Sequence, residues 1–220
     1  MANEPLRCNE IRRAYQTDGD LVWALWDVTM AAEPGKLTVL AGPSGSGKST
    51  LLRVLAGIDQ PDHGTVHIAG KDITAMKPAH RRRFRKTHLG FVFQDPAANL
   101  LSYMTVLEHV EMAGHLRCRE ADLALLDHLE ISELAGQMPV QLSAGQQQRV
   151  ALAAAVTGKP DVVLADEPTA ELDTQSAGLA VETLSRLRDL GTTLVVTSHD
   201  PEVLSVADEV VRIERGVLVE

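Results

Sequence analysis

The stretch Gly42-Pro43-Ser44-Gly45-Ser46-Gly47-Lys48-Ser49-Thr50 decides the fold of this chain. It matches the phosphate-loop pattern, GxxxxGK followed by Ser or Thr. The apolar, β-branched run 37–41 before it is typical of a buried strand, and the run 51–56 after it is typical of a helix. A glycine loop between a strand and a helix lets backbone N–H groups surround phosphate oxygens. We expect Lys48 to reach the β- and γ-phosphates of a nucleotide and Ser49 to bind Mg2+. The alternative is a glycine-rich turn that matches by chance, which the flanking strand and helix disfavour.

Composition and charge limit the kinds of function open to the chain. Its 220 residues, 45% of them hydrophobic, suit one large α/β domain with an inserted or appended subdomain. The net charge of −9 argues against a dedicated nucleic-acid-binding domain. No apolar run approaches the roughly 18 residues of a membrane span, and residues 1–7 lack a signal-peptide core. Cys8 and Cys118 stand alone, so we expect reduced thiols and a cytoplasmic location. From the end of the sequence at residue 220 we expect no C-terminal regulatory domain.

Polar residues follow three further predicted strands, at the sheet edge where α/β folds place ligands. They are Gln94 after the run 89–93, Asp166 and Glu167 after 161–165, and His199 after 192–197. An aspartate that helps to hold Mg2+ is the expected companion of a phosphate loop. Solvated strand-end acids and a structural histidine are the alternatives. Because these residues are expected at the same sheet edge as Lys48, we favour a catalytic site.

Residues 97–157 interrupt the alternation of strands and helices and are predicted to be all-helical. A capping box at Thr105 predicts a helix to about Leu116, and leucines at helical spacing predict another over 120–129. We expect an inserted helical subdomain. The expected organisation is one domain, 1–220, made of the α/β core segments 1–96 and 158–220 and the helical insert 97–157.

A second capping box, Ser143 to Gln146, opens a predicted helix that runs to Thr157. Gly145 lies just inside this helix, where glycine costs about 1 kcal/mol relative to alanine. That cost indicates that something approaches the backbone closely, and an anion at the helix N-terminus is one candidate.

Two exposed features outside the motifs have open interpretations. Alternating runs between residues 8 and 30 predict short antiparallel strands, with Tyr15 on their connection. Tyr15 could stack on a base or simply pack, and Trp23 and Trp26 are competing candidates for stacking. The basic run 80–86 is most simply a solvated helix face, and contact with a phosphate or headgroup is its alternative.

Together these motifs resemble those of the ATP-binding subunits of ABC transporters along nearly the whole chain. The matching elements are Walker A at 42–49, the Q-loop at Gln94, the signature at 142–146 with Ser143, Ala144, Gly145 and Gln146, Walker B at 162–166 with the catalytic Glu167, the D-loop at 170–173 ending in Asp173, and the switch histidine His199. The resemblance implies a P-loop NTPase core with a mostly parallel sheet and an N-terminal antiparallel β subdomain. It also implies that Tyr15 stacks on adenine. The sequences of the motifs are most similar to those of the ABC ATPases of lipoprotein release, macrolide export and cell division.

The resemblance further implies ATP hydrolysis with Mg2+. Lys48 and the loop amides would offset the charge on the γ-phosphate, and His199 would contact it. Glu167 would polarise the attacking water. The implied metal ligands are Ser49, Gln94 and, through water, Asp166.

The same resemblance implies two protein partners. Ser143 and Gly145 of a second copy would close over the γ-phosphate in an ATP-dependent, head-to-tail homodimer. An integral membrane permease would hold the chain at the inner face of the cell membrane, without direct contact with nucleic acid. The apolar loop 100–104 predicts the docking groove, between the core and the helical insert. The permease would choose the transported substrate.

Three positions depart from the family pattern without removing a catalytic group: Ala144 where Gly is usual, Ala154 where Arg is common, and Glu171 in the D-loop. They bear on the rate of hydrolysis. A soluble ABC-type ATPase not coupled to transport is the alternative, although such proteins usually carry two ATPase domains or a coiled-coil insertion. A small-molecule kinase would not explain residues 142–146. A non-catalytic regulator would fit the loss of Glu167 or His199, and both are present.

Overall fold

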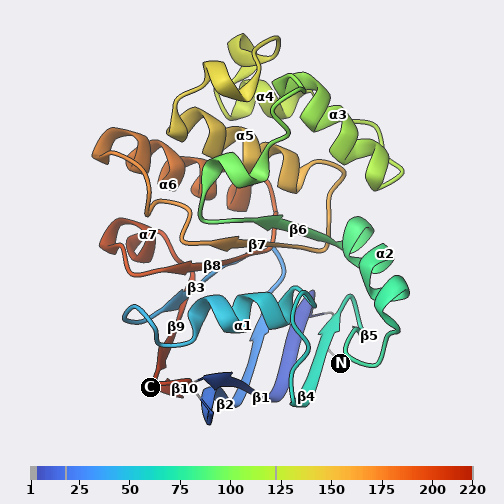
Figure 1. Cartoon of the computed structure of the whole chain (residues 1–220). Helices are drawn as coiled ribbons and strands as arrows, with labels where there is room; N and C mark the ends of the chain where they lie inside the picture. The colour runs from blue at the N-terminus through green and yellow to red at the C-terminus, as the bar shows by residue number, and fades with distance from the viewer. Residues whose placement is uncertain (1–3, 18, 122, 220) are drawn as a thin grey trace.

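Two β-sheets with a helix between them form the frame of the chain (Figure 1). The computed structural model describes residues 4–17, 19–121 and 123–219, so the predicted outer limits of the domain, residues 1 and 220, lie outside it. One sheet is antiparallel, in the order β2-β1-β4-β5. The other has the order β10-β9-β3-β8-β7-β6 and is parallel except for the β9–β10 hairpin. The strands are β1 (Leu6–Thr17), β2 (Asp20–Ala32), β3 (Leu37–Ala41), β4 (His63–Ile68), β5 (Lys71–Asp72), β6 (Leu89–Val92), β7 (Val162–Asp166), β8 (Leu194–Ser198), β9 (Glu209–Glu214) and β10 (Val217–Val219).

The helices lie in layers on either side of the parallel sheet. Helix α1 lies between the two sheets, α5 and α6 cover the other face, and α3 and α4 lie beyond α5 (Figure 1). Their bounds are α1 (Lys48–Leu55), α2 (Pro78–His88), α3 (Val106–Leu116), α4 (Ala124–His128), α5 (Ala144–Val156), α6 (Thr174–Asp189) and α7 (Pro201–Ser205), with 3-10 turns η1 (Pro96–Asn99), η2 (Ser132–Leu134) and η3 (Pro139–Gln141).

The central strand β3 is buried on both faces, as its apolar run predicts. Successive side chains of a strand point to opposite faces. Leu37 and Val39 therefore join one core, under α5, α6 and α7. Leu40 joins the other, between α1 and the antiparallel sheet. This double burial fixes the phosphate loop that follows the strand.

The helical segment 97–157 shares its core with the parallel sheet. Val106 and Val110 of α3 and Leu126 of α4 belong to the same buried cluster as Val39 and Val163. The predicted insert is therefore continuous in its packing with the α/β core.

The predicted strands between residues 8 and 30 are wrong in length. β1 and β2 are two long paired strands, and their register shifts between Cys8 and Ile11 and again near Arg13. Glu10 and Asp27 have left-handed backbone angles, with φ of 50° and 52°. Such bulges interrupt the alternation of side chains, which in the sequence is indistinguishable from the end of a strand.

The predicted helix over 120–129 is also too long, because α4 begins at Ala124. The backbone N–H of Arg119 bonds to Gly114 O, and that of Cys118 bonds to His115 O. These bonds turn the chain back over the end of α3. Leu123 is exposed, so only part of the leucine spacing reflects burial.

Candidate functional site

A hollow at the carboxyl ends of the parallel strands collects most of the predicted site residues. Its volume is about 300 Å3, and it is lined by Ala24, Ser44, Gly45, Gly47, Lys48, Ser49, Thr50, Gln94, Glu167, Ala170 and His199. All of them except Ala24 belong to motifs that the sequence analysis identified. The order of the strands places β3, β7 and β8 side by side. The loop after each strand therefore meets the others at one edge.

The phosphate loop is built around positions where a side chain does not fit. A Cβ atom on Gly42 would lie 2.2 Å from Ile213 O, and one on Gly47 would lie 2.6 Å from Ala24 O. Gly47 also has a φ of 105° and gives α1 no side-chain cap. The first N–H groups of α1 are therefore available to an anion. The hydroxyl of Ser46 is buried and has no hydrogen-bond partner within the described part of the chain, which also fits a phosphate ligand.

Lys48 is held in the hollow by backbone carbonyls and one carboxylate. Its Nζ lies 2.9 Å from Gly42 O and 3.1 Å from Pro43 O, and both carbonyls accept hydrogen bonds from it. The same atom lies 3.2 Å from Glu167 Oε1. The two residues are only 5% and 8% exposed. A buried ammonium that faces a phosphate loop can bind phosphate oxygens by exchanging these contacts.

Glu167 has a strained backbone that aims its carboxylate into the hollow. Its φ is 43°, and its N–H donates to Thr197 O at 3.1 Å and to Thr197 Oγ1 at 2.8 Å. His199 Nδ1 lies 3.1 Å from Glu167 Oε2. Left-handed angles at residues other than glycine cost about 1–3 kcal/mol and concentrate at functional sites. The carboxylate thus lies between an ammonium and an imidazole.

Asp166 lies one residue earlier and faces the start of α1. Ser49 Oγ donates to Asp166 Oδ1 at 2.9 Å, and Thr197 Oγ1 donates to the same oxygen at 2.7 Å. Gln94 lines the same hollow, and its Nε2 donates to Glu171 Oε1 at 3.5 Å. A hydroxyl, a carboxylate and an amide are oxygen donors that suit Mg2+.

The donor set does not form a metal cage by itself. Among the described residues, no three His, Cys, Asp or Glu side chains come together as a metal site. Mg2+ usually keeps several waters and binds through one or two carboxylates together with substrate phosphates. The residues present fit a metal ion that arrives with a nucleotide.

Tyr15 lies outside the lining of the hollow but is tied to α1. Its hydroxyl donates to Asp59 Oδ2 at 3.3 Å, and the guanidinium of Arg13 lies 4.7 Å from the ring centroid. Asp59 also accepts from Arg53, which lowers the pKa of Asp59. Arg53 lies one turn after Ser49 on α1. The phenol is thus held beside the helix that begins at the phosphate loop.

The competing aromatic residues occupy the neighbouring strand. Trp23 and Trp26 of β2 pack edge to face with ring centroids 4.8 Å apart, and both are exposed. The guanidinium of Arg12 covers the Trp26 ring at 4.5 Å. Neither ring lines the hollow.

The signature residues are capped as predicted but lie apart from the hollow. Ser143 N–H donates to Gln146 Oε1 at 2.9 Å, and Gln146 N–H donates to Ser143 Oγ at 3.2 Å. Ala144 and Gly145 follow in the first turn of α5. The hollow around Lys48 is lined by none of these four residues.

The close approach to Gly145 is real, but within the chain it is made by a side chain and not by an anion. A Cβ atom on Gly145 would lie 2.6 Å from Ser176 Cβ, on α6. Asp173 is the N-cap of α6 and accepts from Ser176 Oγ at 2.7 Å. The signature helix and the predicted D-loop residue are therefore linked through Ser176.

Thr197 contacts both acidic residues of the site, and the sequence-based prediction missed it. It contacts Asp166 through its hydroxyl and Glu167 through its hydroxyl and carbonyl. A threonine near the end of an otherwise apolar buried strand, two residues before His199, was the available signal.

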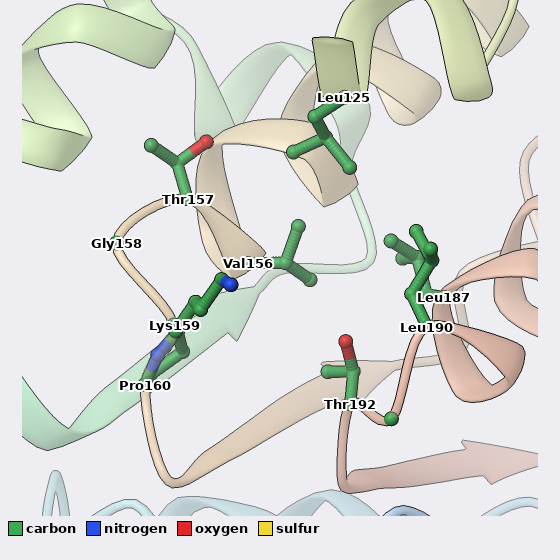
Figure 2. A pocket seen from close by; sticks show the side chains of 10 residues that line it. Leu125, Val156, Thr157, Gly158, Lys159, Pro160, Leu187, Leu190 and Thr192 are labelled. Carbon is green, nitrogen blue, oxygen red and sulfur yellow. The ribbon is translucent and has the colours of Figure 1, made fainter. Parts of the chain in front are cut away.

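A second cavity, of about 220 Å3, lies at the opposite ends of β7 and β8 (Figure 2). Leu125, Val156 and Leu187 line it from α4, α5 and α6, with Lys159 and Thr192 from the loops. Among the residues that the structure describes, its lining contains no carboxylate, imidazole or thiol. It lacks the paired acid and base groups that the first hollow has.

Comparisons with known proteins agree on one family. Residues 25–170 match the family model described as ABC transporter. The chain is 37% identical to the lipoprotein-releasing system ATP-binding protein LolD of Paramagnetospirillum magneticum, over 100% of both chains. It is also 37% identical to the macrolide export ATP-binding/permease protein MacB of Salmonella choleraesuis, over 96% of this chain and 33% of that one. The chain thus spans about a third of the length of such macrolide-export relatives.

A solved structure supports the same fold. The dimeric post-hydrolysis state of the ATP-binding cassette MJ0796, bound to ADP and Pi, superposes with a TM-score of 0.86 at 31% identity. The match covers 98% of this chain and 97% of that one. The predicted fold class is confirmed. No helix of the described residues is long and apolar enough to cross a membrane.

Proposed function

Because the chain belongs to the ABC transporter family and is one of its ATP-binding ATPase cassettes, we propose that it dimerises head to tail around ATP and powers a membrane permease. The observation that carries this proposal is the buried contact between Lys48 and Glu167, beside the Ser49–Asp166 pair, in one hollow behind a phosphate loop. This arrangement supplies a phosphate-binding cation and a base within reach of one reacting centre.

The proposed reaction is phosphoryl transfer to water. Water attacks the γ-phosphorus while the bond to the bridging oxygen of ADP breaks. Lys48 transfers its hydrogen bonds from Gly42 O and Pro43 O to phosphate oxygens, and its movement releases the carboxylate of Glu167. Glu167 then orients and polarises the attacking water. His199, already 3.1 Å from Glu167, contacts the γ-phosphate.

Ser49 and Gln94 would hold Mg2+ through their oxygen atoms, and Asp166 would hold it through water. When bound, the ion neutralises charge that develops on the phosphate oxygens. Thr197 keeps Asp166 oriented by its 2.7 Å hydrogen bond.

The dimer proposal rests on the separation between the signature and the hollow. Ser143, Ala144, Gly145 and Gln146 form a capped helix start that does not line the hollow of its own chain. A second copy turned head to tail could bring this helix start to the γ-phosphate. The MJ0796 cassette, described as dimeric with ADP and Pi, supports this arrangement. Asp173 caps the adjoining helix α6 and would lie at the same interface.

The permease proposal rests on a groove between the core strand β6 and the helical insert. The groove, of about 220 Å3, is lined by β6, α3 and α5 through residues such as Phe91, Leu116 and Ala151. In the predicted docking loop, Leu100 is buried in the core, whereas Leu101 and Tyr103 are 39% and 72% exposed. The exposed pair, and not the whole loop, fits a partner contact.

The relatives support a location at a membrane. They are named for lipoprotein release and macrolide export, and one carries its permease in the same chain. We place this chain at the inner face of the cell membrane, held there by its permease. The division into core segments 1–96 and 158–220 and helical insert 97–157 is part of the same proposal.

The test of the function is to look for a membrane permease in the neighbouring reading frames and to co-purify this chain with it. We expect that protein to stimulate ATP hydrolysis, and the double variant Leu101→Ser with Tyr103→Ser to lose stimulation while keeping basal hydrolysis. The matched control, Leu21→Ser with Leu190→Ser, removes two other exposed leucines and should keep both. Normal stimulation of the first double variant would place the docking contact elsewhere. Absence of ATP turnover in the wild-type chain would overturn the proposed function.

A further inference from the structure

Helix α2 carries the densest group of positive charges in the chain. Positions 77–86 hold six of the 21 Lys and Arg residues, and positions 73–94 contain none of the 30 Asp and Glu residues. We call these six side chains the basic surface of α2: Lys77, Arg81, Arg82, Arg83, Arg85 and Lys86. It stands out in a chain whose net charge is −9.

The basic surface has neutral partners only, among the residues that the structure describes. Arg82, Arg83 and Lys86 are exposed and form no ion pair there. Arg85 donates to Gly57 O at 2.8 Å, and Arg81 donates to the side-chain amide of Gln60 at 3.4 Å. The exposed cations elsewhere in the fold often lie against carboxylates, as Arg7 does with Glu4.

The arginines of this surface repel one another. Burial lowers the pKa of Arg85, and the neighbouring charges of Arg81 and Arg82 lower it further. The same three guanidinium groups line a hollow of about 220 Å3 between the end of α1 and the start of α2. Three like-charged guanidinium groups around a hollow of this size would be stabilised by a ligand that carries phosphate groups.

The surface adjoins the groove that would receive the permease. Lys86, near the end of α2, lines that groove together with Leu116 and Arg117 from the end of α3. Figure 1 shows α2 beside the outer end of β6, at the edge of the core and below α3. A helix at this place would face the membrane that holds the permease.

We propose that the basic surface of α2 binds the anionic phospholipid head groups of the membrane beside the permease. The proposal rests on the proposed function, because the permease sets which side of the chain faces the bilayer. Anionic leaflets attract basic segments by about fivefold in affinity per Lys or Arg near the surface. Nucleic acid fits less well, because Phe84, the one phenylalanine of α2, is buried and stacked on His88 and cannot stack on bases.

Co-sedimentation of the full chain with lipid vesicles tests the proposal. One set of vesicles is pure phosphatidylcholine, and in the other roughly a third of the lipid is phosphatidylglycerol, both at about 0.1 M salt. We expect the wild-type chain to bind only the anionic vesicles. Arg82→Gln with Arg83→Gln should weaken binding about 30-fold. The control, Arg7→Gln with Lys36→Gln, removes the same charge from residues that contact carboxylates and should bind like wild type.

Each other outcome overturns the proposal. Equal binding to both kinds of vesicle, or equal losses in the two double variants, would show that the surface has no specific role. Displacement from vesicles by millimolar inorganic phosphate would indicate a site for a free anion. Binding of a short oligonucleotide, lost in Arg82→Gln with Arg83→Gln but without vesicle binding, would make it a nucleic-acid surface. Basal ATP hydrolysis, measured on the same samples without lipid, reports separately on the proposed function.

Discussion

The phosphate loop and the signature are both helix starts, yet only one of them finds its chemistry within the chain. Helix α1 begins after Gly47, which has no side chain to cap it, so its first N–H groups remain available to a ligand. Helix α5 begins after Ser143, whose hydroxyl and the Gln146 side chain satisfy the helix start reciprocally. The first is a preformed anion site. The second is already satisfied and is presented outward on a rigid support.

The groups at the two helix starts also differ in burial. Lys48 and Glu167 are buried and held by contacts with each other and with the loop. Ser143 and Ala144 are exposed, whereas Leu142 before them and Gly145 after them are buried, Gly145 against Ser176 of α6. A site whose groups converge can bind ATP alone. Under the proposed dimer, a site whose polar groups face solvent would be completed by a second copy, and this difference can be tested residue by residue.

Glu167→Gln should produce the largest effect, because it removes a charge at the centre of the preformed site. ATP binding should survive, since Lys48 and the loop amides are unchanged. Hydrolysis should slow by about 10²–10⁴-fold, the usual contribution of a positioned base. Without hydrolysis, the ATP-bound dimer should persist. Size-exclusion chromatography should give a dimer with ATP and Mg2+ and a monomer with ADP.

Two further variants serve as comparisons for Glu167→Gln. Lys48→Ala should lose ATP binding and never dimerise. Asp166→Asn should lose the dependence of activity on Mg2+ together with the activity itself. A Glu167→Gln chain that stays monomeric in ATP and turns over like wild type would refute the role given to Glu167.

Gly145→Ala should destabilise the support of the second site. Its Cβ atom would lie 2.6 Å from Ser176 Cβ, so we expect a loss of about 3 kcal/mol in unfolding free energy, at the upper end for overpacking. Ser176→Gly should restore part of that loss, because it removes both atoms that clash. The measurement is urea denaturation of both single variants and the double variant.

Measurements of ATP binding and hydrolysis on the same variants show whether Gly145 is needed for packing or for a contact with nucleotide. The double variant should bind ATP as a monomer, because Lys48 and its loop are untouched. If the double variant also regains full hydrolysis, Gly145 is needed only for packing against Ser176. A glycine at this position is then not needed for α5 to approach the ATP of a second copy. If Gly145→Ala is as stable as wild type, the contact with Ser176 is not the constraint.

Tyr15→Ala should weaken ATP binding by the preformed site by about 1–3 kcal/mol, the usual value for loss of a stacked aromatic ring. Tyr15→Phe keeps the ring but loses the hydrogen bond to Asp59, so binding should fall much less. Titration of the monomer with ATP measures both. Equal losses would show that the hydroxyl, and not the ring, matters. Trp26→Ala tests the competing candidate: the Trp26 ring packs against Trp23 and Arg12 on β2, so its loss should leave ATP binding unchanged if Tyr15 is the stacking residue.

The sequence predicts the preformed site well because its chemistry is local to motifs. Strand-end positions placed Gln94, Glu167 and His199 around Lys48, and the structure puts all four in one hollow. The capping box of α5 was equally readable, since it depends on two residues three positions apart.

Contacts between distant elements could not be read in this way. The role of Thr197 depends on β7 and β8 being neighbours, which no local pattern states. The approach of Ser176 to Gly145 depends on how α5 crosses α6, and the sequence showed only that something must come close. The bulges of β1 and β2 likewise depend on pairing between strands, so their interrupted alternation was misread as several short strands.

Ala144→Gly should produce the smallest effect and the sharpest distinction between the two sites. Ala144 is exposed at the first position of α5, so its methyl group faces outward, away from the hollow of its own chain. Removing the methyl should cost less than about 1 kcal/mol in unfolding free energy. ATP affinity of the monomer should not change. Hydrolysis under conditions that form the dimer should rise, by less than about tenfold, because the backbone of α5 can approach the γ-phosphate of the second copy more closely.

Ala154→Gly is the comparison on the same helix, because Ala154 also departs from the family pattern but lies ten residues after Ala144, in the helix interior. It should leave the rate of hydrolysis in the dimer unchanged. An altered ATP affinity of the Ala144→Gly monomer would mean that the signature acts on the nucleotide of its own chain. Equal rates for the two variants would mean that the methyl group does not face ATP. Since both measurements use the same helix and the same conditions, the difference between them isolates what the outward-facing helix start contributes across the dimer.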